Sequence, residues 1–195
     1  MRNRPLSKCG VAILAMAMLT LLHPAAAQSR ATEAKMAATK IEIPKSVRTE
    51  HKAIHSALEK ATQSPGRVGT AAKELAEVLD PHFVREEQIA LPPLGLLAPL
   101  AAGDRLPENV LSEALAMSDS LRSELPRMLE EHKQIRAAVE KLRVAARAAK
   151  AAGPEQLAEQ LALHAGTEEE VLYPAAILVG DIIRAQPKAS SRPGE

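Results

Sequence analysis

Residues 82–87 read His-Phe-Val-Arg-Glu-Glu, and residues 164–169 read His-Ala-Gly-Thr-Glu-Glu. In both stretches a proline lies ten residues after the histidine. A Glu-His-Lys-x-Ile motif precedes each stretch, at residues 50–54 and 131–135, so the two histidines of a copy are 31 or 32 residues apart. Because an internal repeat indicates a repeated structural unit, the sequence predicts two helical hairpins.

The spacing of apolar residues predicts four helices. The chain has one phenylalanine, one tyrosine and no tryptophan, which suits packed helices better than a sheet. Pro81 lies inside the second helix and is expected to kink it just before His82, and Pro126 is a candidate break in the third helix. The predicted fold class is all-α, an up-down four-helix bundle built from two duplicated helical hairpins. We expect the helices at residues 44–63, 68–90, 108–151 and 153–185, with a loop at 103–107.

The first 27 residues have the order of a secretory signal peptide. Basic residues within 1–8 precede an apolar run at 10–22, and His-Pro-Ala-Ala-Ala precedes Gln28. The apolar run is shorter than the ~20 residues of a spanning helix, so cleavage after Ala27 is expected in preference to an uncleaved anchor. The predicted domains are a signal peptide at 1–27, a disordered linker at 28–43, the bundle at 44–185 and a disordered tail at 186–195.

The composition excludes several classes of function. Cys9 is the only cysteine and lies in the predicted signal, so the mature chain is expected to have neither disulfides nor thiolate metal ligands. Cleavage removes three basic and no acidic residues, which changes 25 basic against 24 acidic residues into 22 against 24, a formal charge of −2. This charge gives no reason to expect nucleic acid as a partner, and we expect no membrane partner once the signal is cleaved. A cleaved signal without a lipid-attachment cysteine favours a periplasmic location.

Every predicted helix carries a histidine in its apolar stripe, and two of them carry a glutamate four residues later. A single such histidine is most often a satisfied core residue. An unpaired carboxylate in an apolar interior costs several kcal/mol, however, and two close together repel each other. A set of imidazoles and carboxylates without sulfur suits iron, manganese or zinc. The candidate metal ligands are His51, His82, Glu86, His132, His164 and Glu168.

Three neighbouring residues bear on this site. Glu87 and Glu169 turn about 100° away from the stripe. We expect them to be solvated or to contact the outer nitrogen of a histidine. Tyr173 follows the last motif and is expected either to be a buried residue with a satisfied hydroxyl or to cover the site.

The duplicated pattern resembles the hemerythrin family and its bacterial cation-binding relatives, over about residues 44–185. Ferritin-like carboxylate proteins use Glu-x-x-His, whereas here the histidine comes first and the gap is four. The resemblance implies two iron ions joined by an oxo or hydroxo bridge, with manganese or zinc as alternatives. It implies that Glu86 and Glu168 bridge the ions. It also implies terminal ligands, two to each ion, from His51, His82, His132 and His164.

The family's fifth histidine has no direct counterpart, because Arg136 stands four residues after His132. His55 stands four residues after His51 and is a candidate replacement, with a surface histidine as the alternative. With bridging ligands counted, five histidines leave one coordination position open on the ion pair and four leave two. One open position suits reversible dioxygen binding, and two favour peroxide or nitric oxide chemistry.

The function predicted from the sequence is that of an exported di-iron protein that binds dioxygen, another small diatomic or iron itself, for storage, delivery or sensing. One alternative is a di-iron oxidase or peroxidase, or a nitric-oxide-reactive protein. No general base, nucleophile or phosphate loop stands out beyond the proposed ligands, which favours a binding protein over an enzyme. Another alternative is a structural helical bundle with zinc or no metal.

Overall fold

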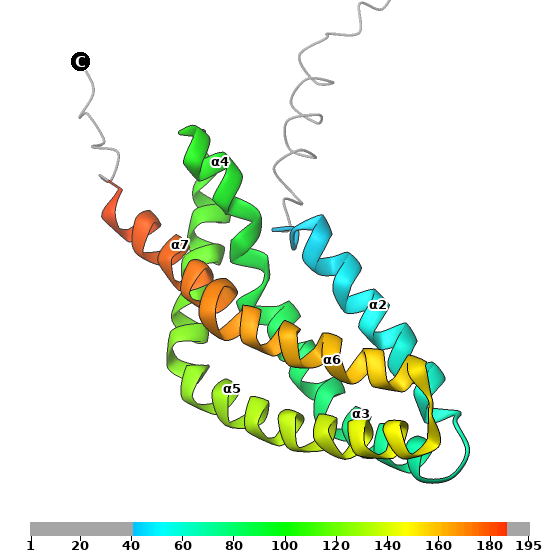
Figure 1. The fold of residues 1–195 in the computed structure, drawn as a ribbon. Coiled ribbons are helices and arrows are strands. Elements are labelled where there is room, and N and C mark those ends of the chain that lie inside the picture. The colour runs from blue at the N-terminus through cyan, green and yellow to red at the C-terminus, as the bar shows by residue number, and fades with distance from the viewer. Residues whose placement is uncertain (1–40, 187–195) are drawn as a thin grey trace, which may run out of the picture. The chain divides into compact units, whose positions relative to one another are not determined.

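The computed structural model describes residues 41–186, and within them every regular element is helical. The all-helical prediction is therefore confirmed for this part of the chain (Figure 1). The predicted signal peptide, most of the predicted linker and nearly all of the predicted tail lie outside the described residues. Within the described range, no helix is both long and apolar enough to cross a membrane.

Two helical hairpins make up the bundle, as the repeat predicts. The bounds of the first are α2 (Lys45–Thr62) and α3 (Gly66–Arg85), continued by the π-helical η1 (Glu86–Ala90). A 3-10 segment η2 (Pro92–Leu96) and the short α4 (Leu97–Ala102) lead to the second hairpin. The second consists of α5 (Glu108–Ala149), α6 (Ala152–Thr167), the π-helical η3 (Glu168–Leu172) and α7 (Tyr173–Ala185).

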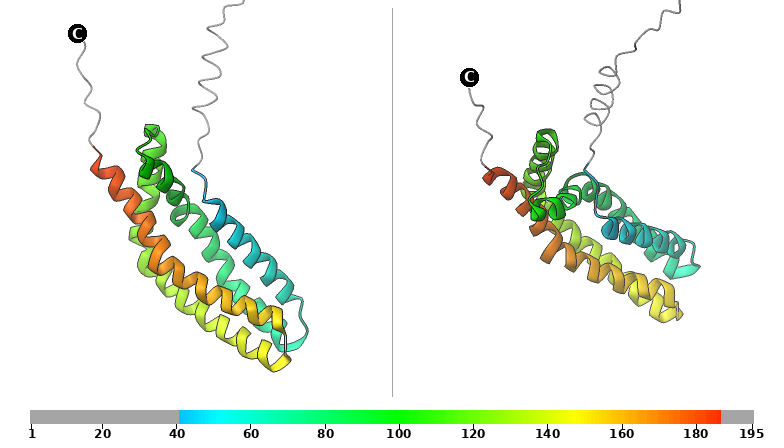
Figure 2. Two further views of the ribbon diagram at one scale, coloured as in Figure 1. Left: turned by 45° about the horizontal axis from the view of Figure 1, so that its top comes forward. Right: turned by 90° about the horizontal axis from the view of Figure 1, so that it is seen from above.

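The hairpins lie side by side, with α3 packed on α5 and α2 packed on α6 (Figure 2). Each hairpin turn contains a residue in the left-handed region, Gly66 with φ 64° in the first and Lys150 with φ 51° in the second. Glycine adopts this conformation without the steric cost that a Cβ brings, which explains Gly66. The helix α5 runs without interruption through Pro126 and curves along its length (Figure 2), so the break considered at this proline does not occur.

Two apolar clusters lie along the bundle, and a polar layer separates them. On α2 the buried His51 lies between Val47 and Ile54, and on α5 the buried His132 lies between Met128 and Ile135. One cluster lies toward the hairpin turns and is built around Ile54, Leu58, Leu75, Leu79, Ile135, Leu142 and Leu161. The other lies on the opposite side of the polar layer and is built around Val47, Leu91, Leu94, Leu121, Met128 and Tyr173.

The packed unit begins before the predicted boundary at residue 44. Ile41, assigned to the linker in the sequence prediction, is buried in a third apolar cluster with Leu96 and Val110. The backbone here passes so close to η2 that a Cβ on Gly95 would lie 2.1 Å from the carbonyl oxygen of Glu42. A side chain at residue 95 would therefore displace the segment that leads into α2.

Candidate metal centre

Six buried side chains from both hairpins meet in the polar layer between the two apolar clusters. Each of them is at most 3% exposed. They form two groups that share both glutamates, and within each group the potential ligand atoms all lie within 4.8 Å of one another. We call the first group subsite 1, formed by His51, His164, Glu86 and Glu168, and the second subsite 2, formed by His82, His132, Glu86 and Glu168.

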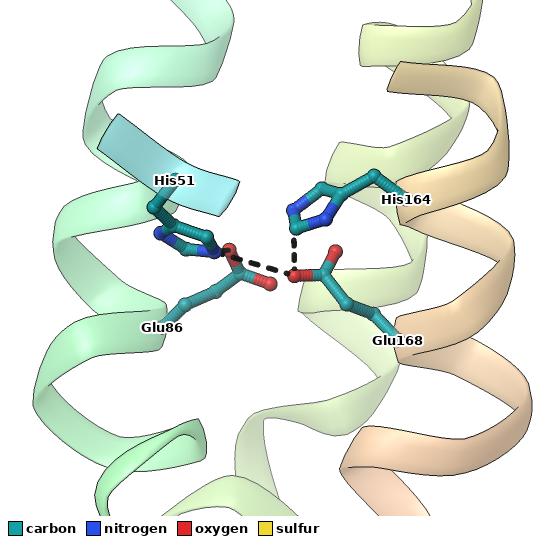
Figure 3. A group of neighbouring side chains, drawn as sticks. All are labelled: His51, Glu86, His164 and Glu168. Carbon is teal, nitrogen blue, oxygen red and sulfur yellow. Dashed lines mark ion pairs between the residues drawn. The ribbon is translucent and has the colours of Figure 1, made fainter. Parts of the chain in front are cut away.

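In subsite 1 the four side chains point toward one another (Figure 3). The Nε2 atom of His51 lies 3.8 Å from Glu86 Oε2 and 3.7 Å from Glu168 Oε1. The Nε2 atom of His164 lies 2.9 Å from the same Glu168 oxygen. Each glutamate thus presents one carboxylate oxygen to this subsite.

Subsite 2 uses the other oxygen of each carboxylate. The Nε2 atom of His82 lies 3.3 Å from Glu86 Oε1, and that of His132 lies 3.4 Å from Glu168 Oε2. Both glutamates therefore stand between the two subsites, with one oxygen facing each. This is the arrangement that two bridging carboxylates require.

Both glutamates begin a π-helical segment, η1 at Glu86 and η3 at Glu168. The backbone N–H of Leu91 donates to the carbonyl oxygen of Glu86, and that of Tyr173 donates to the carbonyl oxygen of Glu168. These are bonds across five residues, and single π turns of this kind often occur at functional sites. The matched prolines one residue further on have no N–H to continue an ordinary α ladder, and they are the sequence signal from which these turns could have been predicted.

Subsite 1 contains most of the buried polar atoms that lack a hydrogen-bond partner. In the described part of the chain six buried side-chain nitrogen and oxygen atoms have none, and five of them belong to His51, His164, Glu86 and Glu168. Buried polar groups in folded proteins are nearly always paired, so an orphaned cluster of nitrogen and oxygen atoms calls for an ion or water. The atoms present are imidazole nitrogens and carboxylate oxygens, which are ligands for divalent metals.

A second ring of four glutamates faces the outer nitrogens of the histidines. Glu87 and Glu169 lie near the Nδ1 atoms of His51 and His132, at 3.4 and 2.8 Å, as anticipated from the sequence. The other two were not predicted from the sequence: Glu131 lies 3.0 Å from His82 Nδ1, and Glu50 lies 3.3 Å from His164 Nδ1. The sequence feature that could have identified them is that each copy of the repeat has a glutamate directly before its first histidine.

These outer contacts orient the imidazoles. In subsite 2, Glu131 and Glu169 accept the Nδ1 protons of His82 and His132, so the lone pair of each Nε2 faces the centre, as metal binding requires. Glu50 and Glu131 each reach the histidine of the other hairpin, while Glu87 and Glu169 reach one in their own hairpin. The outer ring therefore also ties the two hairpins together.

The two subsites differ in how their outer glutamates are held. Glu131 accepts hydrogen bonds from Arg85 at 2.6 Å and from Arg127 at 3.1 Å. Glu169 accepts one from Arg136 at 2.9 Å. Burial opposes ionisation of both carboxylates, but the histidine and arginine contacts outweigh it and lower the pKa of each. Both glutamates serve subsite 2, so the imidazoles of that subsite have the more firmly fixed outer contacts.

In the metal-free chain, the pKa values of the two buried glutamates are shifted in opposite directions. Burial and the nearby Glu168 raise the pKa of Glu86. Burial opposes ionisation of Glu168 as well, but its contacts with three histidines lower its pKa well below the usual range. Burial also opposes protonation of His164, yet the contact with Glu168 dominates and raises the pKa of His164 to about 9. Burial and the adjacent Glu86 raise the pKa of Tyr173, so its hydroxyl keeps its proton.

The structure does not bring His55 into the cluster. Its imidazole is half exposed, and its Nδ1 lies 3.7 Å from Asp80. The physical reason is Phe83, whose ring stacks on His51 with the centroids 4.2 Å apart and meets His55 edge-on at 5.1 Å. The phenyl ring thus fills the space on the inner side of His55, and the structure favours the surface alternative for this residue.

The fold and the cluster together define a helical bundle with an interior histidine and carboxylate site suited to metal. The sequence profile of the hemerythrin HHE cation-binding domain matches residues 43–176. This match covers well over half of the chain, so the chain belongs to the hemerythrin HHE cation-binding domain family, and the resemblance drawn from the motifs is confirmed. Comparison with curated proteins and with solved structures gave no match.

Proposed function

We propose that this chain is an exported di-iron protein of hemerythrin type that binds dioxygen or another small diatomic at its metal pair. The metal-binding part of the proposal follows from the family and from the buried cluster. The observation that carries it is the set of orphaned nitrogen and oxygen atoms in subsite 1. Two cations would neutralise the buried carboxylates and give a partner to the four of these atoms that face the centre, His51 Nε2, His164 Nε2, Glu86 Oε2 and Glu168 Oε1.

The proposed ligand set contains four imidazole nitrogens and two carboxylates that bridge. Nitrogen and oxygen donors without sulfur suit iron, and manganese or zinc would also fit. Ferrous ions held there would supply electrons and open coordination positions to a small diatomic. The set consists of His51 and His164 at subsite 1, His82 and His132 at subsite 2, and Glu86 and Glu168 between them.

The protein's own contribution is to hold this set in the interior of the bundle. Glu131 and Glu169 fix the imidazole orientations of subsite 2, and the apolar clusters on both sides keep bulk water away from the carboxylates. Phe83 covers the face of His51 that would otherwise be open toward His55. Such surroundings favour binding of a small apolar diatomic over hydrolysis or transfer chemistry on larger substrates.

The test is a cycle of oxygen exposure on the iron-loaded chain. The protein is loaded with ferrous iron without oxygen, exposed to oxygen and then purged, while its absorption spectrum is recorded. Colour that appears and then disappears is the expected result. Persistent colour would favour oxidation or iron storage, and no colour would refute the iron assignment.

A matched pair of variants controls for nonspecific iron. His51 and His55 lie one turn apart on α2, but only His51 belongs to the cluster. His51→Ala is expected to lose at least one ion per chain, whereas His55→Ala should keep both. Equal loss of iron in the two variants would contradict the proposed ligand set.

Export is supported by the order of the first 27 residues, which is that of a cleaved signal. The mature chain would then work outside the cytoplasm, in a periplasm, without lipid attachment. The mass of the chain recovered from the envelope fraction tests this, because cleavage after Ala27 gives an N-terminal Gln28. Recovery of the uncleaved chain in the cytoplasm would contradict it.

A further inference from the structure

The hydroxyl of Tyr173 lies inside subsite 2. Tyr173 is the first residue of α7, directly after the η3 segment, and is 1% exposed. Its oxygen lies 3.2 Å from His132 Nε2 and 3.5 Å from His82 Nε2, and it donates a hydrogen bond to Glu86 Oε1. The phenol oxygen thus contacts three of the atoms already assigned to this subsite.

The two contacts of the phenol oxygen with the imidazole nitrogens have the spacing of atoms bound to one metal ion. Two ligand atoms at right angles around an ion, each roughly 2.1 Å away, are about 3 Å apart. The phenol oxygen lies 3.2 and 3.5 Å from the two Nε2 atoms. The assigned ligand atoms of subsite 2 are separated in the same way, by 3.3 Å from His82 to Glu86 and by 3.4 Å from His132 to Glu168.

The repeat places no such oxygen at subsite 1. Tyr173 ends the π turn that begins at Glu168, and Leu91 occupies the equivalent place after Glu86. Leu91 is buried and apolar, so it offers subsite 1 no ligand atom. Subsite 1 instead has Phe83 stacked on His51, where the other copy has Ala165. The duplicated sequence has therefore diverged at the two places that make the subsites chemically different.

We propose that Tyr173 is a fifth protein ligand, bound through its phenol oxygen to the ion in subsite 2. This inference rests on the proposed di-iron function and deepens it. On binding, the O–H bond breaks, the oxygen to metal bond forms and the proton passes to solvent, because metal ligands bind in their deprotonated form. Phenolate is a hard, anionic donor, so this ligand favours the ferric state at subsite 2.

The consequence is an unequal ion pair. With four histidines alone, two coordination positions stay open, and Tyr173 fills one of them on subsite 2. The remaining open position then lies on subsite 1. A single open position is the condition for binding one small diatomic. Tyr173 therefore supplies the fifth terminal ligand that was expected to be a histidine.

The experiment is resonance Raman spectroscopy of the iron-loaded, oxidised chain, excited within its visible absorption band. Tyr173 is the only tyrosine of the chain, so any ring vibrations of an iron-bound phenolate must come from it. Iron content is measured on the same samples. The expected result is phenolate ring vibrations in the wild type and their complete loss in Tyr173→Phe, which removes only the oxygen.

Two further variants keep the result interpretable. Phe83→Leu changes the other aromatic ring of the site and should retain the phenolate vibrations. Tyr173→Leu reproduces the residue of the first copy and replaces Tyr173→Phe if that variant does not fold. Two irons per chain without phenolate vibrations, or vibrations that persist in the Tyr173 variants, would overturn the tyrosine ligand alone. A wild-type chain that binds no iron would overturn the proposed function together with it.

Discussion

Glu86 and Glu168, the two glutamates shared by the subsites, are expected to have different effects on the stability of the metal-free chain. Both are fully buried, but burial and Glu168 raise the pKa of Glu86 despite its nearby imidazoles, whereas contacts with three histidines lower the pKa of Glu168. Glu86 also accepts a hydrogen bond from Tyr173. Glu86→Gln therefore removes a carboxyl whose ionisation is opposed by burial and by Glu168. Glu168→Gln removes the charge that the protonated His164 faces.

The magnitudes follow from the cost of separating buried charges. Removing one partner of a buried ion pair costs about 3–5 kcal/mol, because the other charge stays uncompensated. We expect Glu168→Gln to lower the free energy of unfolding by about this amount. Glu86→Gln keeps an acceptor for the hydroxyl of Tyr173 and relieves the repulsion with Glu168, so its free energy of unfolding should stay within about 1 kcal/mol of the wild type or rise.

The assay is urea unfolding followed by helical circular dichroism, with chelator present and at pH 7. A domain with an unfolding free energy of about 5–15 kcal/mol leaves room to measure a loss of this size. The same variants in the iron-loaded state should both lose at least one ion per chain, whatever their effect without metal. A metal-free Glu168→Gln chain as stable as Glu86→Gln would refute the assignment of charges in the cluster, and retention of two ions by either variant would refute its bridging role.

Three further predictions concern pH, an outer glutamate and helix packing. A raised pKa of about 9 for His164 means that its stabilising contribution is complete below pH 6.5 and is lost as the pH rises through 9. Urea unfolding of the metal-free chain should show a loss of about 3 kcal/mol over that range, with no such loss after metal loading. Glu131→Gln should weaken metal binding at subsite 2 by about 10- to 100-fold, measured by competition with a chelator of known affinity. Unchanged affinity would show that Glu131 does not support metal binding. Gly180→Ala should destabilise the bundle, because the new Cβ would lie 2.5 Å from that of Ser118. Gly166 has open space around it, so Gly166→Ala should raise the free energy of unfolding by about 0.5–1 kcal/mol. Thermal unfolding of both variants tests this difference.

The repeat made much of the fold predictable. Helical spacing located the four main helices to within a few residues, because each one has a continuous apolar stripe. Pro126 was considered as a break, yet α5 continues through it, since a proline in a long helix can be accommodated by bending. The burial of Ile41 was not predictable, because it depends on the close approach that Gly95 allows to the backbone of Glu42.

The candidate site was predictable where the two copies agree and unpredictable where they differ. The histidines of the cluster occupy matched positions, so spacing alone identified them. His55 has no histidine at its matched position, which is Arg136, and its place was decided by the ring of Phe83. The sequence left two possibilities for Tyr173, and only the three-dimensional contacts with His82 and His132 place its hydroxyl in subsite 2.

The outer glutamates show a similar division. Helical rotation pointed to Glu87 and Glu169, because each follows a bridging glutamate on the same helix. Glu50 and Glu131 contact a histidine of the opposite hairpin, and such a contact depends on how the hairpins are packed. A sequence pattern within one helix carries no information on that packing.

The two-metal site is tested most directly by a crystal of the iron-loaded chain, with anomalous diffraction recorded at the iron absorption edge. Two anomalous peaks per chain are expected. One lies between His51 and His164, the other between His82 and His132, and Glu86 and Glu168 stand between the two peaks. An empty cluster, or a single peak shared by all four histidines, would contradict the two-metal site on which the proposed function depends.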